Sequence, residues 1–114
     1  MLLKQVIIID DEKDFCKLME NYFLKKKYKV EVYYLLNDGL KALENHSSGI
    51  VFLDNNLPDG LGWQKFTELR ETHPGLILHL LSGYNYISTA IPEKGHVKFW
   101  QKPINFAELD EYFK

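Results

Sequence analysis

The sequence has a single cysteine, Cys16, and no run of 18 consecutive apolar residues. One cysteine cannot form a disulfide within the chain, which suits a reducing compartment. A membrane-spanning helix needs a longer apolar segment than any present here, and the first residues lack the pattern of a secretory signal. We therefore expect a soluble, cytoplasmic protein that has no membrane partner.

An excess of positive charge is also missing. The chain carries 14 Lys and Arg against 16 Asp and Glu, a formal net charge of -2. Proteins that hold nucleic acid usually present a basic surface to the phosphates, so we expect no direct nucleic-acid binding. At 114 residues and 46% apolar content, the chain is long enough to bury one core. We expect a single domain over residues 1–114.

What the sequence does contain is an alternation of two kinds of segment. Short segments rich in branched and aromatic residues are typical of strands, and they occupy residues 5–10, 29–36, 49–54, 76–82 and 97–101. The first, third and fourth are almost continuously apolar, as strands covered on both faces are.

Helical patterns separate these strands. Apolar residues recur at helical spacing in Phe15, Leu18, Met19, Tyr22 and Phe23, and this spacing predicts an amphipathic helix. We expect further helices within 38–46, 62–73 and 105–113, and a short one between 84 and 95, where Pro92 limits its length. Five strands alternating with five helices predict an α/β fold with an open parallel sheet.

Polar residues stand where the predicted strands end: Asp10, Asp11, Asp54, Ser82 and Lys102. Each of them alone has an ordinary structural explanation, as a helix start, a turn or a solvated side chain. In a parallel sheet, however, the carboxyl ends of the strands meet at one edge, where ligands bind. The sequence therefore predicts that three carboxylates, a hydroxyl and a lysine converge.

This set of groups favours phosphoryl chemistry. Three carboxylates at close quarters need protons or a cation to neutralise them. Oxygen ligands with room for water suit Mg²⁺, and no His/Cys set for zinc occurs. A metal ion and a lysine neutralise the charge that develops on phosphoryl oxygens while a carboxylate attacks.

The chain resembles the receiver domain of two-component response regulators. The resemblance rests on four ordered motifs, IIIDDE, VFLDNNLPDG, LLSGY and QKPI, and covers essentially the whole sequence. It implies a doubly wound, flavodoxin-like (βα)5 fold with a five-stranded parallel sheet in the order 2-1-3-4-5. It also implies a signalling module in a phosphorelay rather than a turnover enzyme.

The resemblance assigns a role to each matching residue. Asp54 matches the phosphoacceptor, and Mg²⁺ would be held by Asp11 directly, by Asp10 largely through water, by Asp54 and by the backbone carbonyl of Asn56. Lys102 matches the lysine that pairs with the phosphoryl group, and the Lys102–Pro103 bond is usually cis in the family.

Two further positions match the conformational switch of the family. Ser82 matches the hydroxyl residue that reorients toward the phosphoryl group, and Phe99 matches the aromatic residue that then packs inward. The partners implied are a sensor histidine kinase or phosphotransfer protein and a downstream effector of unknown identity. A phosphorylation-dependent homodimer stays open.

Two other functions compete with this interpretation. An aspartate-nucleophile phosphatase usually needs a second aspartate two residues after the nucleophile as acid and base, and that position holds Asn56. A receiver-like interaction module that no longer uses phosphate is the alternative that remains.

Overall fold

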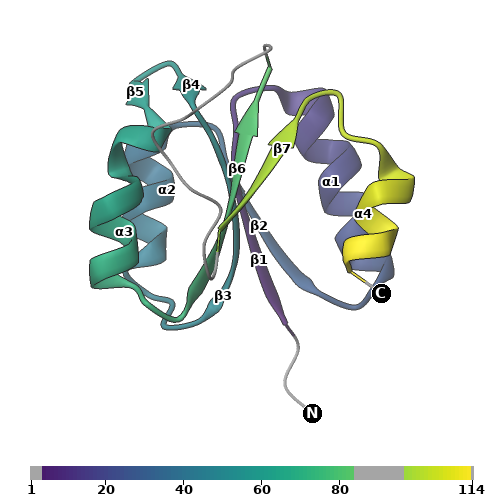
Figure 1. The fold of residues 1–114 in the computed structure, drawn as a ribbon, viewed down its shortest axis with the longest axis horizontal. Helices are drawn as coiled ribbons and strands as arrows, with labels where there is room; N and C mark the ends of the chain where they lie inside the picture. Colours follow the sequence, from purple (N-terminus) through teal and green to yellow (C-terminus); the bar gives the residue numbers. More distant parts are fainter. Residues whose placement is uncertain (1–3, 84–96, 114) are drawn as a thin grey trace.

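The computed structural model describes residues 4–83 and 97–113 (Figure 1). Its main sheet contains five parallel strands in the order β2-β1-β3-β6-β7. Their bounds are β1 Gln5–Ile9, β2 Lys29–Tyr33, β3 Gly49–Asp54, β6 Leu76–Ser82 and β7 Val97–Gln101. Counted along the main sheet alone, this is the predicted order 2-1-3-4-5, so the predicted fold class is confirmed.

Helices cover both faces of the sheet. Figure 1 shows α1 (Lys13–Lys25) and α4 (Phe106–Tyr112) on one face and α2 (Leu36–Leu43) and α3 (Phe66–Thr72) on the other. The fourth of the five helices expected from the sequence falls between 84 and 95, outside the described residues. Within the described parts of the chain, no helix combines the length and the apolar character needed to cross a bilayer.

The loop after β3 contains structure that the sequence did not predict. Strands β4 (Asn56–Leu57) and β5 (Gly60–Leu61) pair as a short antiparallel ribbon, and the 3-10 turn η1 (Gly62–Lys65) leads into α3. The second helix was expected within 38–46, but α2 starts at Leu36. The Asp59 carboxylate caps this start, because it accepts hydrogen bonds from the backbone N–H groups of Leu36 (2.7 Å) and Asn37 (2.9 Å). A carboxylate that caps a helix from a distant loop leaves no local sequence signal.

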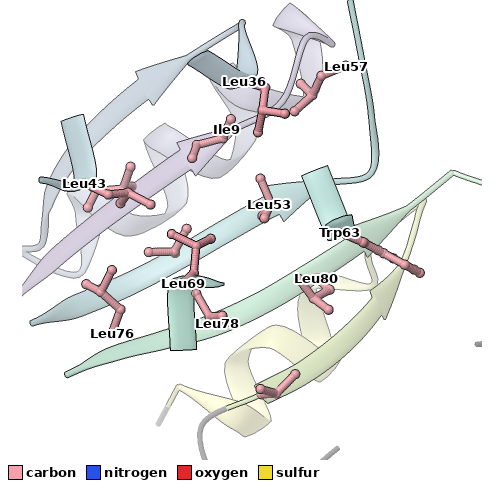
Figure 2. Packing of buried hydrophobic residues seen from close by; sticks show 13 residues of the cluster. Ile9, Leu36, Leu43, Leu53, Leu57, Trp63, Leu69, Leu76, Leu78 and Leu80 are labelled. Atoms are coloured by element: carbon pink, nitrogen blue, oxygen red, sulfur yellow. The ribbon is translucent and has the colours of Figure 1, made fainter. Parts of the chain in front are cut away.

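Two apolar cores lie on opposite sides of the sheet because successive strand residues point to opposite faces. On β1, Ile7 and Ile9 pack toward α2 and α3, whereas Val6 and Ile8 pack toward α1 and α4. Figure 2 shows the first of these cores, in which aliphatic side chains from the strands meet those of the helices. Burial on both faces accounts for the nearly continuous apolar run of this strand.

Two glycines allow helices and turns to pack directly on the strand ends. A Cβ on Gly39 would lie 2.5 Å from the Ile9 side chain, so α2 approaches β1 closely. A Cβ on Gly62 would lie 2.1 Å from the carbonyl oxygen of Asp54. The Gly62 N–H donates to the Asn55 carbonyl over 2.9 Å, which holds the loop after β3 against the end of that strand.

Candidate functional site

The polar residues predicted at the strand ends do lie at one edge of the sheet. Asp54 is the last residue of β3, and Asp10 follows β1, with its backbone N–H donating to the Tyr33 carbonyl over 3.0 Å. Lys102 follows β7, and its backbone N–H donates to the carbonyl of Ser82, the last residue of β6, over 2.7 Å. Backbone ladders therefore fix the Cα positions of these residues.

Asp10, Asp11 and Asp54 form a carboxylate cluster. Each can offer one oxygen, and these three atoms lie within 4.8 Å of one another. Asp10 is fully buried, Asp54 is 5% exposed and Asp11 is exposed to solvent. Asp10 Oδ1 also accepts a hydrogen bond from the Glu12 N–H (2.8 Å), just before α1 begins.

Lys102 supplies a positive charge to this cluster. Its Nζ lies 2.5 Å from Asp10 Oδ2, 2.6 Å from Glu12 Oε1 and 3.6 Å from Asp54 Oδ1. The side chain is only 9% exposed, and Nζ lies 4.7 Å from the centre of the Phe15 ring. The ammonium group is therefore held by carboxylates on one side and covered by an aromatic face on another.

Burial dominates the ionisation of these groups. It is the largest cause that raises the pKa of Asp54 to about 7, followed by the negative charge of Asp10, while Lys102 acts in the opposite direction. Burial likewise raises the pKa of Asp10 despite its hydrogen bond with Lys102. Burial is the largest single influence on the pKa of Lys102 and lowers it. The hydrogen bonds to Asp10 and Glu12 and the negative charges of Asp10 and Asp54 together outweigh burial, so the pKa is raised.

An open cleft of about 540 Å³ gives access to the Asp54 side chain. Its lining includes five charged or polar residues and one glycine: Asp11, Glu12, Asp54, Asn56, Gly83 and Lys102. A small anion can enter such a space and reach the Asp54 carboxylate beside the lysine.

The structure gathers most of the residues predicted for the site. Asp11, Asp54, Asn56 and Lys102 line the cleft, and Asp10 is buried next to Lys102. Ser82 is half-buried at the end of β6, directly before Gly83 of the cleft lining. The Lys102–Pro103 peptide bond is cis, as the resemblance predicts.

Phe99 lies away from the cleft. Its ring packs against the core shared with α2 and α3, where it meets the Trp63 ring edge to face at 5.2 Å between centroids. Trp63 is in turn tied to the residue after Asp54, since its backbone N–H donates to Asn55 Oδ1 over 3.1 Å. The described structure thus places Phe99 one ring away from the loop that follows Asp54.

The sequence analysis assigned no role to two residues near the site. Glu12 lies at the mouth of the cleft in contact with Lys102, and the third acid of the DDE run was the signal that could have indicated it. Asn55 uses its side-chain oxygen to hold Trp63, and no sequence signal pointed to that contact.

The donor set of the carboxylate cluster fits a hard divalent cation. All three side chains offer carboxylate oxygens within 4.8 Å of one another, two of them at the wall of an open cleft. Such ligands suit Mg²⁺, which keeps several water molecules, whereas zinc prefers nitrogen and sulfur ligands.

Comparison with known proteins identifies the family. The model of the response regulator receiver domain matches residues 6–114. This chain belongs to the response regulator receiver domain family. As a receiver domain, it has a phosphoacceptor function in two-component signalling, and it is a signalling module of a family whose members bind Mg²⁺ at acidic residues.

Curated relatives are response regulators that are longer than this chain. The photosynthetic apparatus regulatory protein RegA of Rhodobacter capsulatus is 24% identical over 93% of this chain and 59% of its own length. The response regulator protein PilR of Pseudomonas aeruginosa is 25% identical over 97% of this chain and 25% of its own length. The chain therefore spans less than two thirds of the first relative and a quarter of the second.

Solved structures share the fold at lower identity. A CheY-like receiver domain protein from Methanospirillum hungatei has a TM-score of 0.85 and 23% identity, covering 98% of this chain and 91% of its own. The response regulator TrrA from Thermotoga maritima, solved in complex with Mg²⁺ and BeF, has a TM-score of 0.82 and 21% identity, with 97% and 96% covered.

Proposed function

We propose that Asp54 is the phosphoacceptor of this receiver domain and takes its phosphoryl group from a sensor histidine kinase or phosphotransfer protein. The observation that carries this proposal is the position of Asp54: its carboxylate ends β3 at the wall of the open cleft, within 3.6 Å of the Lys102 ammonium group. A nucleophile and a neutralising cation are thereby placed together before any donor arrives.

In the proposed reaction, an ionised Asp54 oxygen attacks the phosphorus atom of the donor phosphohistidine. The new oxygen–phosphorus bond forms as the phosphorus–nitrogen bond breaks, and the imidazole keeps the bonding electron pair and takes up a proton. Lys102 pairs with a phosphoryl oxygen and neutralises part of the charge that is transferred. Because burial raises the pKa of Asp54 to about 7, positive charge near the carboxylate favours the ionised form that attacks.

We propose that Asp10, Asp11, Asp54 and the backbone carbonyl of Asn56 hold Mg²⁺. The close approach of the three carboxylates supports this, because three negative charges within 4.8 Å need neutralisation. When bound, Mg²⁺ would supply additional positive charge toward the phosphoryl oxygens. The structure of TrrA with Mg²⁺ and BeF supports the assignment by analogy.

We also propose that Ser82 and Phe99 carry the response. Ser82 ends β6, the strand next to β3, and its carbonyl accepts a hydrogen bond from the Lys102 N–H. A phosphoryl group on Asp54 would therefore lie near the end of the strand that carries Ser82. Phe99 packs on Trp63, and a change in its rotamer would alter the surface near β7. The downstream effector reads this change, and a phosphorylation-dependent homodimer is one form that the readout can take.

The test of this proposal is intact-mass spectrometry after incubation with acetyl phosphate and Mg²⁺. Wild-type protein is expected to gain one phosphoryl group, stable to the assay but labile to hydroxylamine as acyl phosphates are, and Asp54→Asn is expected to gain none. Asp14→Asn, which changes an exposed aspartate in the first turn of α1, is the matched control and should be phosphorylated. A phosphoryl group on another residue of the wild-type protein would refute the assignment.

A further inference from the structure

Glu12 interacts with Lys102 although it belongs to neither the carboxylate cluster nor the core. Its Oε1 accepts a hydrogen bond from Lys102 Nζ over 2.6 Å. The same ammonium group is 3.6 Å from Asp54 Oδ1, outside hydrogen-bonding distance. Lys102 is therefore bound to Glu12 and Asp10 rather than to the acceptor carboxylate.

The position of Glu12 gives its side chain no evident part in folding. The residue is the N-cap of α1, yet its side chain makes no capping hydrogen bond. The side chain is 60% exposed, and it lines the cleft from which Asp54 is reached. Its hydrogen bond with Lys102 joins the start of α1 to the end of β7.

The contact between Glu12 and Lys102 competes with a phosphoryl group for the positive charge of the lysine. Lys102 has three carboxylates around it, and a phosphoryl oxygen near Asp54 must compete with them for its N–H donors. Glu12 also places a negative charge at the mouth of the cleft, where an anionic donor enters. Both effects raise the free energy of the transition state relative to the unphosphorylated protein.

We propose that Glu12 is a positioning residue that engages the Lys102 ammonium group and thereby slows phosphorylation of Asp54 by anionic small-molecule donors. This inference rests on the proposed role of Asp54 as phosphoacceptor. A kinase or phosphotransfer protein gains binding energy from a large contact surface, and this energy also positions its phosphohistidine. A small anionic donor lacks such a surface, so the contact between Glu12 and Lys102 slows its reaction more.

Three substitutions separate positioning from simple charge repulsion. Glu12→Gln keeps the size of the side chain and removes its charge, whereas Glu12→Asp keeps the charge and shortens the reach toward Lys102 by one methylene group. Asp14→Asn removes the charge of an exposed aspartate in the first turn of α1 and is the matched control. Urea unfolding of each variant verifies that rates are compared between equally folded proteins.

The measurement is the initial rate of phosphorylation by acetyl phosphate, followed by intact mass at saturating Mg²⁺ and constant ionic strength. Glu12→Gln is expected to react about threefold to fivefold faster than wild type, the upper part of the range for an ion pair with one exposed partner. Glu12→Asp is expected to react about threefold faster, because its carboxylate no longer reaches Lys102, and Asp14→Asn should stay within about twofold.

Each alternative result identifies what has failed. A Glu12→Gln protein that reacts no faster than wild type overturns the inference and leaves the role of Asp54 intact. If Glu12→Gln is faster but Glu12→Asp matches wild type, charge alone sets the rate and the positioning role is wrong. If wild-type protein gains no phosphoryl group on Asp54, the proposed function fails, and the inference fails with it.

Discussion

The protein buries titratable groups in two places that differ in almost every other respect. One is the carboxylate cluster of Asp10, Asp11 and Asp54 at the end of the sheet. The other is the His79 cluster, in which His79 of β6 is surrounded by four aromatic rings: Phe52, Trp100, Tyr112 and Phe113. Burial is the largest cause of the pKa shift of both Asp54 and His79, and in both it favours the neutral form.

The His79 cluster is closed and neutral. The Trp100 Nε1–H donates to His79 Nδ1 over 2.8 Å, so the ring proton of the neutral imidazole lies on Nε2. Phe52 stacks on the ring at 4.7 Å between centroids. Burial, assisted by the charge of Lys98, lowers the pKa of His79 to about 3.

The carboxylate cluster is open and charged. It borders a cleft and contacts Lys102. The contacts of Lys102 with Asp10, Glu12 and Asp54 offer several alternative pairings for one cation. The two clusters therefore differ in what they allow. The charged groups at the strand ends can exchange partners, whereas the hydrogen bond between Trp100 and His79 in the core has a single arrangement. The comparison also predicts opposite dependences of stability on pH for Asp54 and His79.

Removing the cation is the strongest test of this division. Lys102→Ala is expected to slow phosphorylation by acetyl phosphate by about 100-fold or more, as the loss of one preorganised charge donor does in enzymes. Lys98→Ala is the matched control: it removes a lysine of β7, the strand that Lys102 follows, and the ammonium group of Lys98 lies over the Trp100 ring at 5.0 Å. The rates come from intact-mass time courses, and equal rates for both variants would show that the charge of Lys102 has no special role.

Sequence reasoning recovered the parts of the fold that depend on local pattern. The almost continuous apolar runs of β1, β3 and β6 identified strands buried on both faces, and the parallel topology then brought Asp54 and Lys102 to one edge. The ribbon formed by β4 and β5 and the early start of α2 escaped prediction, because the Asp59 cap acts across 22 and 23 residues.

Side-chain pairing was the harder part of the prediction. The four histidines look alike in the sequence, yet His79 accepts a hydrogen bond from the indole N–H of Trp100. The register of β6 and β7 creates that contact. It places His79 opposite Lys98, so Trp100 lies two residues further along the neighbouring strand and on the same face of the sheet as Lys98. Glu12 was similarly overlooked, because its partner Lys102 is 90 residues away along the chain.

Lowering the pH is expected to destabilise the protein through His79. The pKa of His79 is about 3 in the folded protein and near 6.5 ordinarily, so between these values only the unfolded chain is protonated. The contribution of His79 to stability is therefore complete above pH 6.5 and is lost as the pH falls toward 3. Between pH 7 and pH 4.5, wild-type protein is expected to lose about 2–3 kcal/mol more of its unfolding free energy than His79→Phe.

This difference is measured by urea unfolding of both proteins at the two pH values. At pH 7 the variant is expected to be the less stable one by about 1 kcal/mol, since the Trp100 N–H loses its acceptor. His73→Phe, a change at the half-exposed end of α3, controls for the loss of one imidazole. An unfolding free energy that falls equally in wild type and His79→Phe would mean that His79 does not oppose protonation.

The opposite dependence is expected at the carboxylate cluster. Asp54 has a pKa of about 7 in the folded protein against an ordinary value of 3.8, so between these values the unfolded chain is ionised while the folded protein keeps the proton. The stability that Asp54 contributes is complete below pH 3.8 and is lost as the pH rises through 7. Asp54→Asn cannot ionise, and in EDTA its stability advantage over wild type should grow by on the order of 2 kcal/mol between pH 5 and pH 8. Urea unfolding measures this growth, with Asp14→Asn as the control for an exposed aspartate. If the stability difference between Asp54→Asn and wild type stays constant or shrinks as the pH rises, Lys102 compensates the charge of Asp54 fully. The carboxylate cluster and the His79 cluster would then differ only in their access to solvent.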